Sequence, residues 1–282
     1  MNRYTVTTFN YLTAAMVSLF FVIMESFPSI SFAEAIGSFS AEFPSVMNGG
    51  IFSFAGSAGW AAVIGLPAGF LYFLGFIYLQ KAVRASGVSL SGSFSKMGVL
   101  VPMTLAIFLW NELPNCMQWA GIFLALVSIL IANIDLSHPS GVLAGFQPVL
   151  LILFLVFGLS EFSNKVYQRF GVLEMKSLFL FFVFTTALLI SGWKMFSQRK
   201  KVHVSHFLTG IAVGIPNYFA SFFLILSLSR LKTAVVFPVY SAATIVLISL
   251  AGWLFFNEKL KTRERIAVGL TVTALVLVNI QP

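Results

Sequence analysis

Two stretches of the sequence decide the fold: AGFLYFLGFIYLQKAVR at residues 68–84 and GIPNYFASFFLILSLSR at residues 214–230. Both are almost entirely apolar, and both lie in longer apolar runs that reach the roughly 20 residues an α-helix needs to cross a bilayer. When the first stretch is laid on the second, Tyr72 meets Tyr218 and the terminal arginines coincide. The sequence therefore predicts membrane-spanning helices that occur as related copies.

The composition of the whole chain also favours a membrane protein. Of its 282 residues, 59% are hydrophobic and 9% are charged, and the mean hydropathy is +0.95. A soluble core cannot bury that much apolar surface, so the lipid bilayer is the expected partner. The single Cys116 excludes a disulfide framework and a multi-Cys metal site. The basic residues behind the net charge of +8 lie in short loops between apolar runs, which is typical of membrane topology and not of nucleic-acid binding.

The apolar runs predict an all-α polytopic membrane protein with about nine transmembrane helices. Short connections near 84–86, 111–114 and 230–232 predict that consecutive helices are antiparallel neighbours in one bundle. The predicted spans are 7–26, 59–80, 88–110, 116–134, 147–169, 175–194, 206–229, 233–256 and 264–281.

Residues 27–58 form the one long connection and contain two Glu, two Pro and several Ser and Gly. We expect an extramembrane loop there, with room for an interfacial helix. Two glycine pairs at a spacing of four, Gly65 with Gly69 and Gly210 with Gly214, would suit close helix packing. The same spacing is common by chance in Gly-rich membrane chains, so both readings stay open.

An internal repeat extends beyond the two opening stretches. A constant shift aligns residues 68–134 with residues 214–280 without a gap. It also matches rare polar residues, which chance similarity between apolar runs explains poorly. These are Ser95 with Ser241, Asn111-Glu112 with Asn257-Glu258, and Asn133 with Asn279. Because the predicted chain crosses the membrane an odd number of times between the copies, we expect inverted repeats, which are characteristic of secondary transporters.

The repeat divides the chain into residues 1–135, with four predicted spans, and residues 136–282, with five. A helix equivalent to 147–169 is therefore expected before Met1. Two explanations remain open: the chain has lost this helix, or the start of the sequence is misplaced and ten spans exist.

Three features of the sequence carry a family resemblance. They are the segment GVSLSGSFSKMGVLVP at residues 87–102, the Asn-Glu pairs that close spans at Glu112 and Glu258, and AVVFP at residues 234–238. In these the chain resembles bacterial EamA-type proteins of the drug/metabolite transporter (DMT) superfamily, over nearly its whole length. The resemblance implies two five-helix inverted repeats around a central solute cavity. It also implies transport of metabolites or drugs, with localisation in the bacterial cytoplasmic (inner) membrane.

Lys96 is the clearest candidate for a solute site. An ionisable residue within a span is costly unless it faces a cavity or a partner. Lys96 lies about 12 Å into the span 88–110, at about 1.5 Å per residue, and Ser93 and Ser95 precede it. The alternative is that the lysine snorkels to the lipid headgroups.

Glu161 and Lys165 stand four residues apart, a spacing that puts them on one helix face, and Asn164 lies on the adjoining turn. The carboxylate and ammonium are expected to form either a structural buried pair or part of a solute or proton site.

The polar residues Asn217, Tyr218, Tyr240 and Thr244 follow a proline within their spans. Proline frees a backbone carbonyl in the membrane, and interrupted helices are where transporters bind polar groups. Kinks that serve packing alone are the alternative.

The leading hypothesis is a secondary active transporter that moves a small metabolite or drug-like solute by alternating access. The alternative is a non-transporting membrane subunit that scaffolds or regulates a partner. The sequence contains no phosphate-binding Gly-rich loop and no catalytic constellation, so we expect no enzyme activity and no cofactor or metal. The Lys and Arg count favours a cytoplasmic N-terminus and an external C-terminus, whereas the family resemblance implies a cytoplasmic C-terminus. Orientation, solute, coupling ion, transport direction and a homodimeric assembly are therefore left open.

Overall fold

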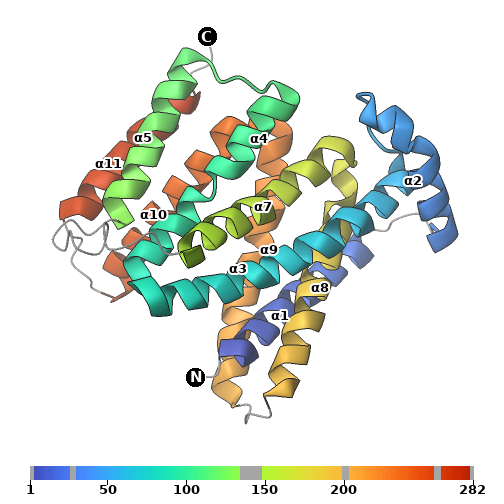
Figure 1. Ribbon diagram of the computed structural model, residues 1–282, viewed down its shortest axis with the longest axis horizontal. Helices are drawn as coiled ribbons and strands as arrows, with labels where there is room; N and C mark the ends of the chain where they lie inside the picture. Colours follow the sequence, from blue (N-terminus) through green and yellow to red (C-terminus); the bar gives the residue numbers. More distant parts are fainter. Residues whose placement is uncertain (1–2, 26–29, 134–147, 199–202, 257–261, 280–282) are drawn as a thin grey trace. The chain divides into compact units, whose positions relative to one another are not determined.

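The computed structural model describes the chain except residues 1–2, 26–29, 134–147, 199–202, 257–261 and 280–282 (Figure 1). The described segments are helical and contain no strand. Within the described residues, five helical segments are long and apolar enough to cross a membrane, and shorter apolar helices accompany them. The chain is an all-α polytopic membrane protein, as predicted. Its elements are α1 Arg3–Met24, α2 Phe32–Met47, α3 Phe54–Met97, α4 Leu100–Trp110, α5 Cys116–Asn133, α7 Pro148–Phe170, η1 Leu173–Met175, α8 Lys176–Ser197, α9 Val204–Arg230, α10 Thr233–Phe256 and α11 Thr262–Asn279.

The helices gather into two compact units. Unit 1 consists of residues Met1–Phe76 and Phe162–Arg230, and unit 2 of residues Ile77–Glu161 and Leu231–Pro282. Helices α3 and α7 therefore contribute to both units. Each unit combines segments from both predicted repeats, and the repeat boundary near residue 135 stays a prediction.

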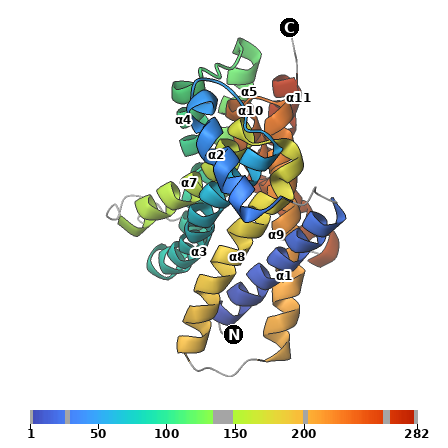
Figure 2. The same cartoon turned by 90° about the vertical axis from the view of Figure 1, so that its right-hand side faces the viewer.

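In unit 1, α1 packs against both α8 and α9 (Figure 2), and α3 contacts α8 at Gly65 and Gly69. A methyl group at Gly214 would lie 2.6 Å from the Asn10 backbone oxygen on α1, and one at Gly65 would lie 2.7 Å from Phe182 Cβ on α8. Such approaches are possible only where the side chain is a hydrogen atom. The glycine pairs at the spacing of four are thus packing faces, in agreement with the first of the two readings.

Unit 2 is built on α4, α5, α10 and α11, and α5 packs along α11. Ala125 and Ile129 of α5 lie in one buried cluster with Ala242 of α10 and Ala274 of α11. The Ser128 hydroxyl adds polar contacts to this interface, because it donates to the Ala267 carbonyl on α11 at 2.8 Å.

One predicted break between spans is wrong. The chain stays helical through residues 84–86, and α3 ends only at Met97, before Gly98. The expected break rests on polar residues, but the segment contains no proline and Arg and Ala are strong helix formers. The breaks expected near 111–114 and 230–232 are confirmed, since α4 ends at Trp110 and α9 at Arg230. The helix for which 27–58 has room is present as α2.

Candidate functional site

A hydrogen-bonded polar cluster joins three helices inside unit 1. The Asn164 side chain on α7 donates from Nδ2 to the Tyr72 hydroxyl on α3 at 3.0 Å. The Tyr72 hydroxyl also lies 3.3 Å from Ser221 Oγ on α9. Asn164 is fully buried and Ser221 is almost so. The Tyr11 hydroxyl on α1 donates to the Tyr72 backbone carbonyl at 3.0 Å, which fixes this turn of α3.

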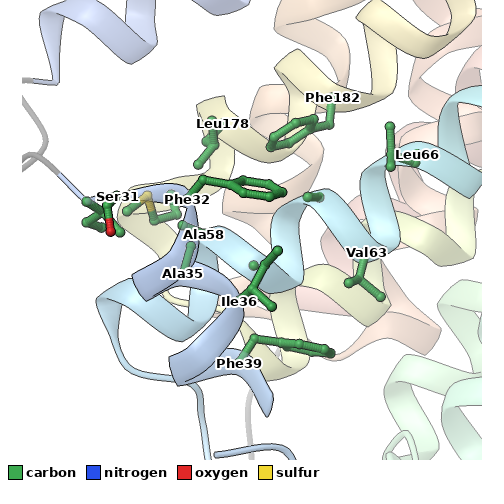
Figure 3. A pocket seen from close by; sticks show the side chains of 14 residues that line it. Ser31, Phe32, Ala35, Ile36, Phe39, Ala58, Val63, Leu66, Leu178 and Phe182 are labelled. Atoms are coloured by element: carbon green, nitrogen blue, oxygen red, sulfur yellow. The ribbon is translucent and has the colours of Figure 1, made fainter. Parts of the chain in front are cut away.

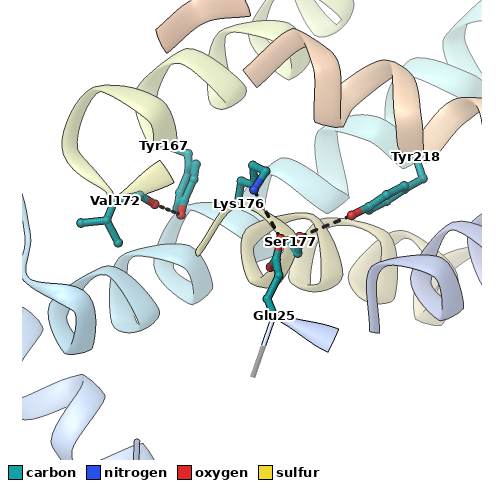
Figure 4. Close-up of polar contacts among 6 residues, drawn as sticks. All are labelled: Glu25, Tyr167, Val172, Lys176, Ser177 and Tyr218. Carbon is teal, nitrogen blue, oxygen red and sulfur yellow. Dashed lines mark hydrogen bonds and ion pairs between the residues drawn. The ribbon is translucent and has the colours of Figure 1, made fainter. Parts of the chain in front are cut away.

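A second cluster in unit 1 contains charged groups (Figure 4). Glu25, which follows α1, accepts hydrogen bonds at Oε1 from Lys176 Nζ at 3.3 Å and from the Ser177 hydroxyl at 3.0 Å. Ser177 Oγ lies 3.4 Å from the hydroxyl of Tyr218 on α9. The Lys176 and Glu25 side chains are 12% and 24% exposed, so the pair is largely withdrawn from solvent. One carboxylate, one ammonium and two hydroxyl groups thus meet where α1, α8 and α9 come together.

Aromatic rings surround the charged cluster. Phe21 stacks on Tyr218 with ring centroids 5.5 Å apart and an interplanar angle of 16°. The Lys176 ammonium lies 4.7 Å from the centroid of the Phe222 ring, within the range of a cation–π interaction. The Lys176 ammonium therefore contacts the Glu25 carboxylate and the face of the Phe222 ring, which together replace much of its hydration.

The predicted site residues fall in both units. Asn164, Asn217 and Tyr218 belong to unit 1. Asn164 and Tyr218 occupy the two clusters described above, whereas Asn217 donates from Nδ2 to Asn10 Oδ1 at 3.3 Å. The proline-containing stretch of α9 thus presents consecutive polar side chains to different neighbours.

The remaining predicted residues belong to unit 2. The Lys96 ammonium interacts electrostatically with the Glu161 carboxylate. The hydroxyl of Ser95 donates to the Gly92 carbonyl at 2.8 Å, and that of Thr244 donates to the Tyr240 carbonyl at 2.7 Å. These hydroxyl groups satisfy the backbone of their own helices. The side chain of Ser93 lies outside the described part of the structure.

The predicted pairing of Glu161 with Lys165 stays a prediction. Glu161 interacts with Lys96, while the buried Lys165 donates from Nζ to Gln168 Oε1 at 3.0 Å. A single solute site that contains all of the predicted residues stays a prediction.

Sequence reasoning did not select Glu25, Lys176, Tyr72 or Ser221 as site residues. Glu25 and Lys176 stand at the ends of their predicted spans, where charged residues ordinarily face the headgroups. Tyr72 carried a usable signal, because the repeat aligns it with the selected Tyr218. Within the described residues, no three His, Cys, Asp or Glu side chains form a group that could hold a metal ion.

Comparison with known proteins connects this chain to membrane proteins. Residues 180–271 match the family described as Small Multidrug Resistance protein. An uncharacterized protein of Haemophilus influenzae is 22% identical over 271 residues, which cover 95% of this chain and 85% of that protein. The uncharacterized membrane protein YvaE of Bacillus subtilis is 37% identical over 59 residues, which cover 21% of this chain and 50% of that protein.

A protein of known crystal structure shares the fold, with a TM-score of 0.68 and 14% sequence identity over 99% of this chain and 88% of that one. Together with the apolar helices, the sequence comparisons support an integral multi-pass membrane protein that transports small solutes, and they favour a transporter over an enzyme.

Proposed function

We propose that this protein is a secondary active transporter of the EamA type within the DMT superfamily. It would move a small metabolite or drug-like solute across a bacterial cytoplasmic (inner) membrane by alternating access, as a monomer or a homodimer. The match of residues 180–271 to a multidrug-resistance family and the relatives in two bacteria support this proposal. The match covers all of α9, which supplies Tyr218 and Ser221 to the two polar clusters.

The observation that carries the proposal is the buried cluster of Tyr72, Asn164 and Ser221. Its three helices are candidate membrane spans, and polar groups in such positions are costly unless they serve a partner or a pathway. Neutral donors and acceptors of this kind can exchange partners with a polar solute at little electrostatic cost. The side chains of the cluster can therefore form hydrogen bonds with a polar solute during its transport.

The repeat supports the same proposal through the bounds of the first two helices. The shift that takes residue 68 to residue 214 takes α1 to residues 149–170, inside α7, and α2 to residues 178–193, inside α8. We infer that α1 is the counterpart of α7 and α2 the counterpart of α8. Each copy then contains five helices among the described residues.

The test is transport by the purified protein in proteoliposomes. A thermal-shift screen of metabolites and drug-like compounds selects solutes, and uptake of the selected radiolabelled solute is then measured with and without ion gradients. Tyr72→Phe removes the hydroxyl that joins Asn164 to Ser221 but keeps the aromatic ring. We expect this variant to lower the transport rate at least about fivefold, or to raise the apparent KM by that factor. The loss of one hydrogen bond costs about 1 kcal/mol, which corresponds to this factor.

Ser227→Ala is the matched control, because the Ser227 hydroxyl is exposed and donates only within its own helix, to the Phe223 carbonyl at 2.9 Å. Its transport rate should equal that of the unmodified protein. Equal transport by Tyr72→Phe and Ser227→Ala would remove the cluster from the solute pathway. Failure of every tested solute, together with stoichiometric co-purification of another membrane protein, would favour the scaffolding subunit.

A further inference from the structure

An apolar pocket lies between α2, α3 and α8 in unit 1 (Figure 3). Its volume is about 500 Å³. Phe32 and Ile36 of α2 form one wall, Val63 and Leu66 of α3 form the floor, and Phe182 of α8 forms the opposite wall. The lining also contains one hydroxyl group, Ser31, whose Oγ already accepts a hydrogen bond from the Glu34 amide at 3.1 Å as the N-cap of α2.

Two close helix contacts on α3 determine the shape of this pocket. At Gly59 a methyl group would lie 2.7 Å from the Ala35 carbonyl oxygen, so α2 touches α3 there. At Gly65 a methyl group would lie 2.7 Å from Phe182 Cβ, so α8 touches α3 about 1.7 turns farther along. Between the two contacts α3 presents the small side chain of Ala62. The pocket is therefore wedge-shaped and lies between the contact of α2 with α3 at Gly59 and the contact of α8 with α3 at Gly65.

The wedge is large enough for a hydrocarbon chain. The α3 residues that line it run from Ala58 to Leu66, about 12 Å along the helix at 1.5 Å per residue. A volume of about 500 Å³ over that length gives a mean width of at least about 7 Å.

The position of the wedge identifies the source of that chain. Val63 and Leu66 are 45% and 51% exposed, and they lie on the candidate span Phe54–Ser86. The medium around this part of α3 is the bilayer, so acyl chains are the groups that meet the opening. Met175 and Leu178 line the pocket beside Lys176, at the start of α8, where a span begins near the headgroups.

We propose that this wedge is a binding site for one acyl chain of a bilayer phospholipid, which joins α2 to α3 and α8. The lipid chain gains little from leaving its apolar surroundings, so its retention rests on close van der Waals contact with three helices. The bound chain supplies the packing that α2 lacks between its contact at Gly59 and the wall formed by α8. This inference does not depend on the transport function.

Photocrosslinking in proteoliposomes tests the proposal. The probe is a phosphatidylethanolamine with a diazirine in one acyl chain, and labelled residues are identified by mass spectrometry after digestion. We expect labelling concentrated at residues 58–66 and 178–182. Ala62→Trp fills the wedge and should reduce that labelling at least fivefold, and Ala62→Leu should reduce it less.

Leu189→Trp is the control, because Leu189 is 67% exposed on α8 and does not line the wedge. It should leave labelling at residues 58–66 unchanged. Size-exclusion chromatography and thermal unfolding establish that each variant is folded before labelling, and Ala62→Leu replaces Ala62→Trp if the larger residue prevents folding. Undiminished labelling in a folded Ala62 variant would overturn the assignment. So would labelling spread evenly over all the lipid-facing spans, or retention of an apolar compound other than a lipid in native mass spectrometry.

Discussion

Substitution of Gly69 by Ala should loosen the contact between α3 and α8. The added methyl group would overlap the Val183 carbonyl oxygen and lie 2.6 Å from Thr186 Cβ, about 0.8 Å inside the 3.4 Å at which ordinary contact begins. Overpacking of this kind costs about 1–3 kcal/mol, and the backbone oxygen cannot rotate away, so we expect the upper end. Ala gains up to about 1 kcal/mol over Gly in a helix. The net loss is about 2 kcal/mol, roughly thirtyfold in the ratio of folded to unfolded protein.

The assay is an SDS titration in mixed micelles, with unfolding followed by tryptophan fluorescence and circular dichroism. Gly37→Ala on α2 and Gly269→Ala on α11 are matched controls, because among the described residues no atom outside the local helix backbone lies within 4 Å of a methyl group at either position. Both controls should be as stable as the unmodified protein or up to about 1 kcal/mol more stable. A Gly69→Ala variant as stable as these controls would refute the packing argument.

Three further perturbations test the contacts at other helix ends and interfaces. Lys176→Met should destabilise the protein by about 1–3 kcal/mol, because it leaves the Glu25 carboxylate without its ammonium; the double variant with Glu25→Gln should recover most of the loss in a double-mutant cycle. Ser128→Ala should cost about 1–2 kcal/mol in the same titration, since its buried hydroxyl contacts two groups on α11. Glu112→Ala removes the carboxylate that accepts from the Thr233 amide at 2.7 Å at the start of α10. Hydrogen exchange at that amide should become about fivefold faster, and an unchanged rate would argue against the cap.

The lengths of the apolar runs predict most helices closely. The predicted span 116–134 is α5, Cys116–Asn133, and the predicted span 147–169 is α7, Pro148–Phe170. The thickness of the hydrocarbon core of the bilayer sets the length of both helices, so a run of apolar residues of that length is enough to locate them. Helix α2 could not be identified as a regular element in this way, because its 16 residues include polar side chains and Pro44. Its position depends on contacts with α3 that single-sequence patterns do not contain.

The failed break at residues 84–86 shows where the repeat loses predictive power. The equivalent positions in the second copy are 230–232, where α9 ends and α10 begins. The break between α9 and α10 is stabilised by residues that follow α4. The Glu112 carboxylate accepts a hydrogen bond from the first amide of α10, and Lys232 donates from Nζ to the Leu113 carbonyl at 2.7 Å. Helix propensity is weak compared with such tertiary contacts. Equivalent sequences can therefore continue as a helix in one copy and stop in the other.

The same limit applies to the candidate site. Tyr72 and its counterpart on α9 occupy equivalent positions, yet their hydroxyl groups have different partners. The shift pairs Asn164 with Ser18, whose hydroxyl donates to the carbonyl four residues earlier in α1. It pairs Ser221 with Gly75, which has no side chain to offer. A repeat predicts which side chains stand at matching positions along the helices. Which of them meet is decided by the packing of each unit, and the polar cluster around Tyr72 consequently has no copy around the second tyrosine.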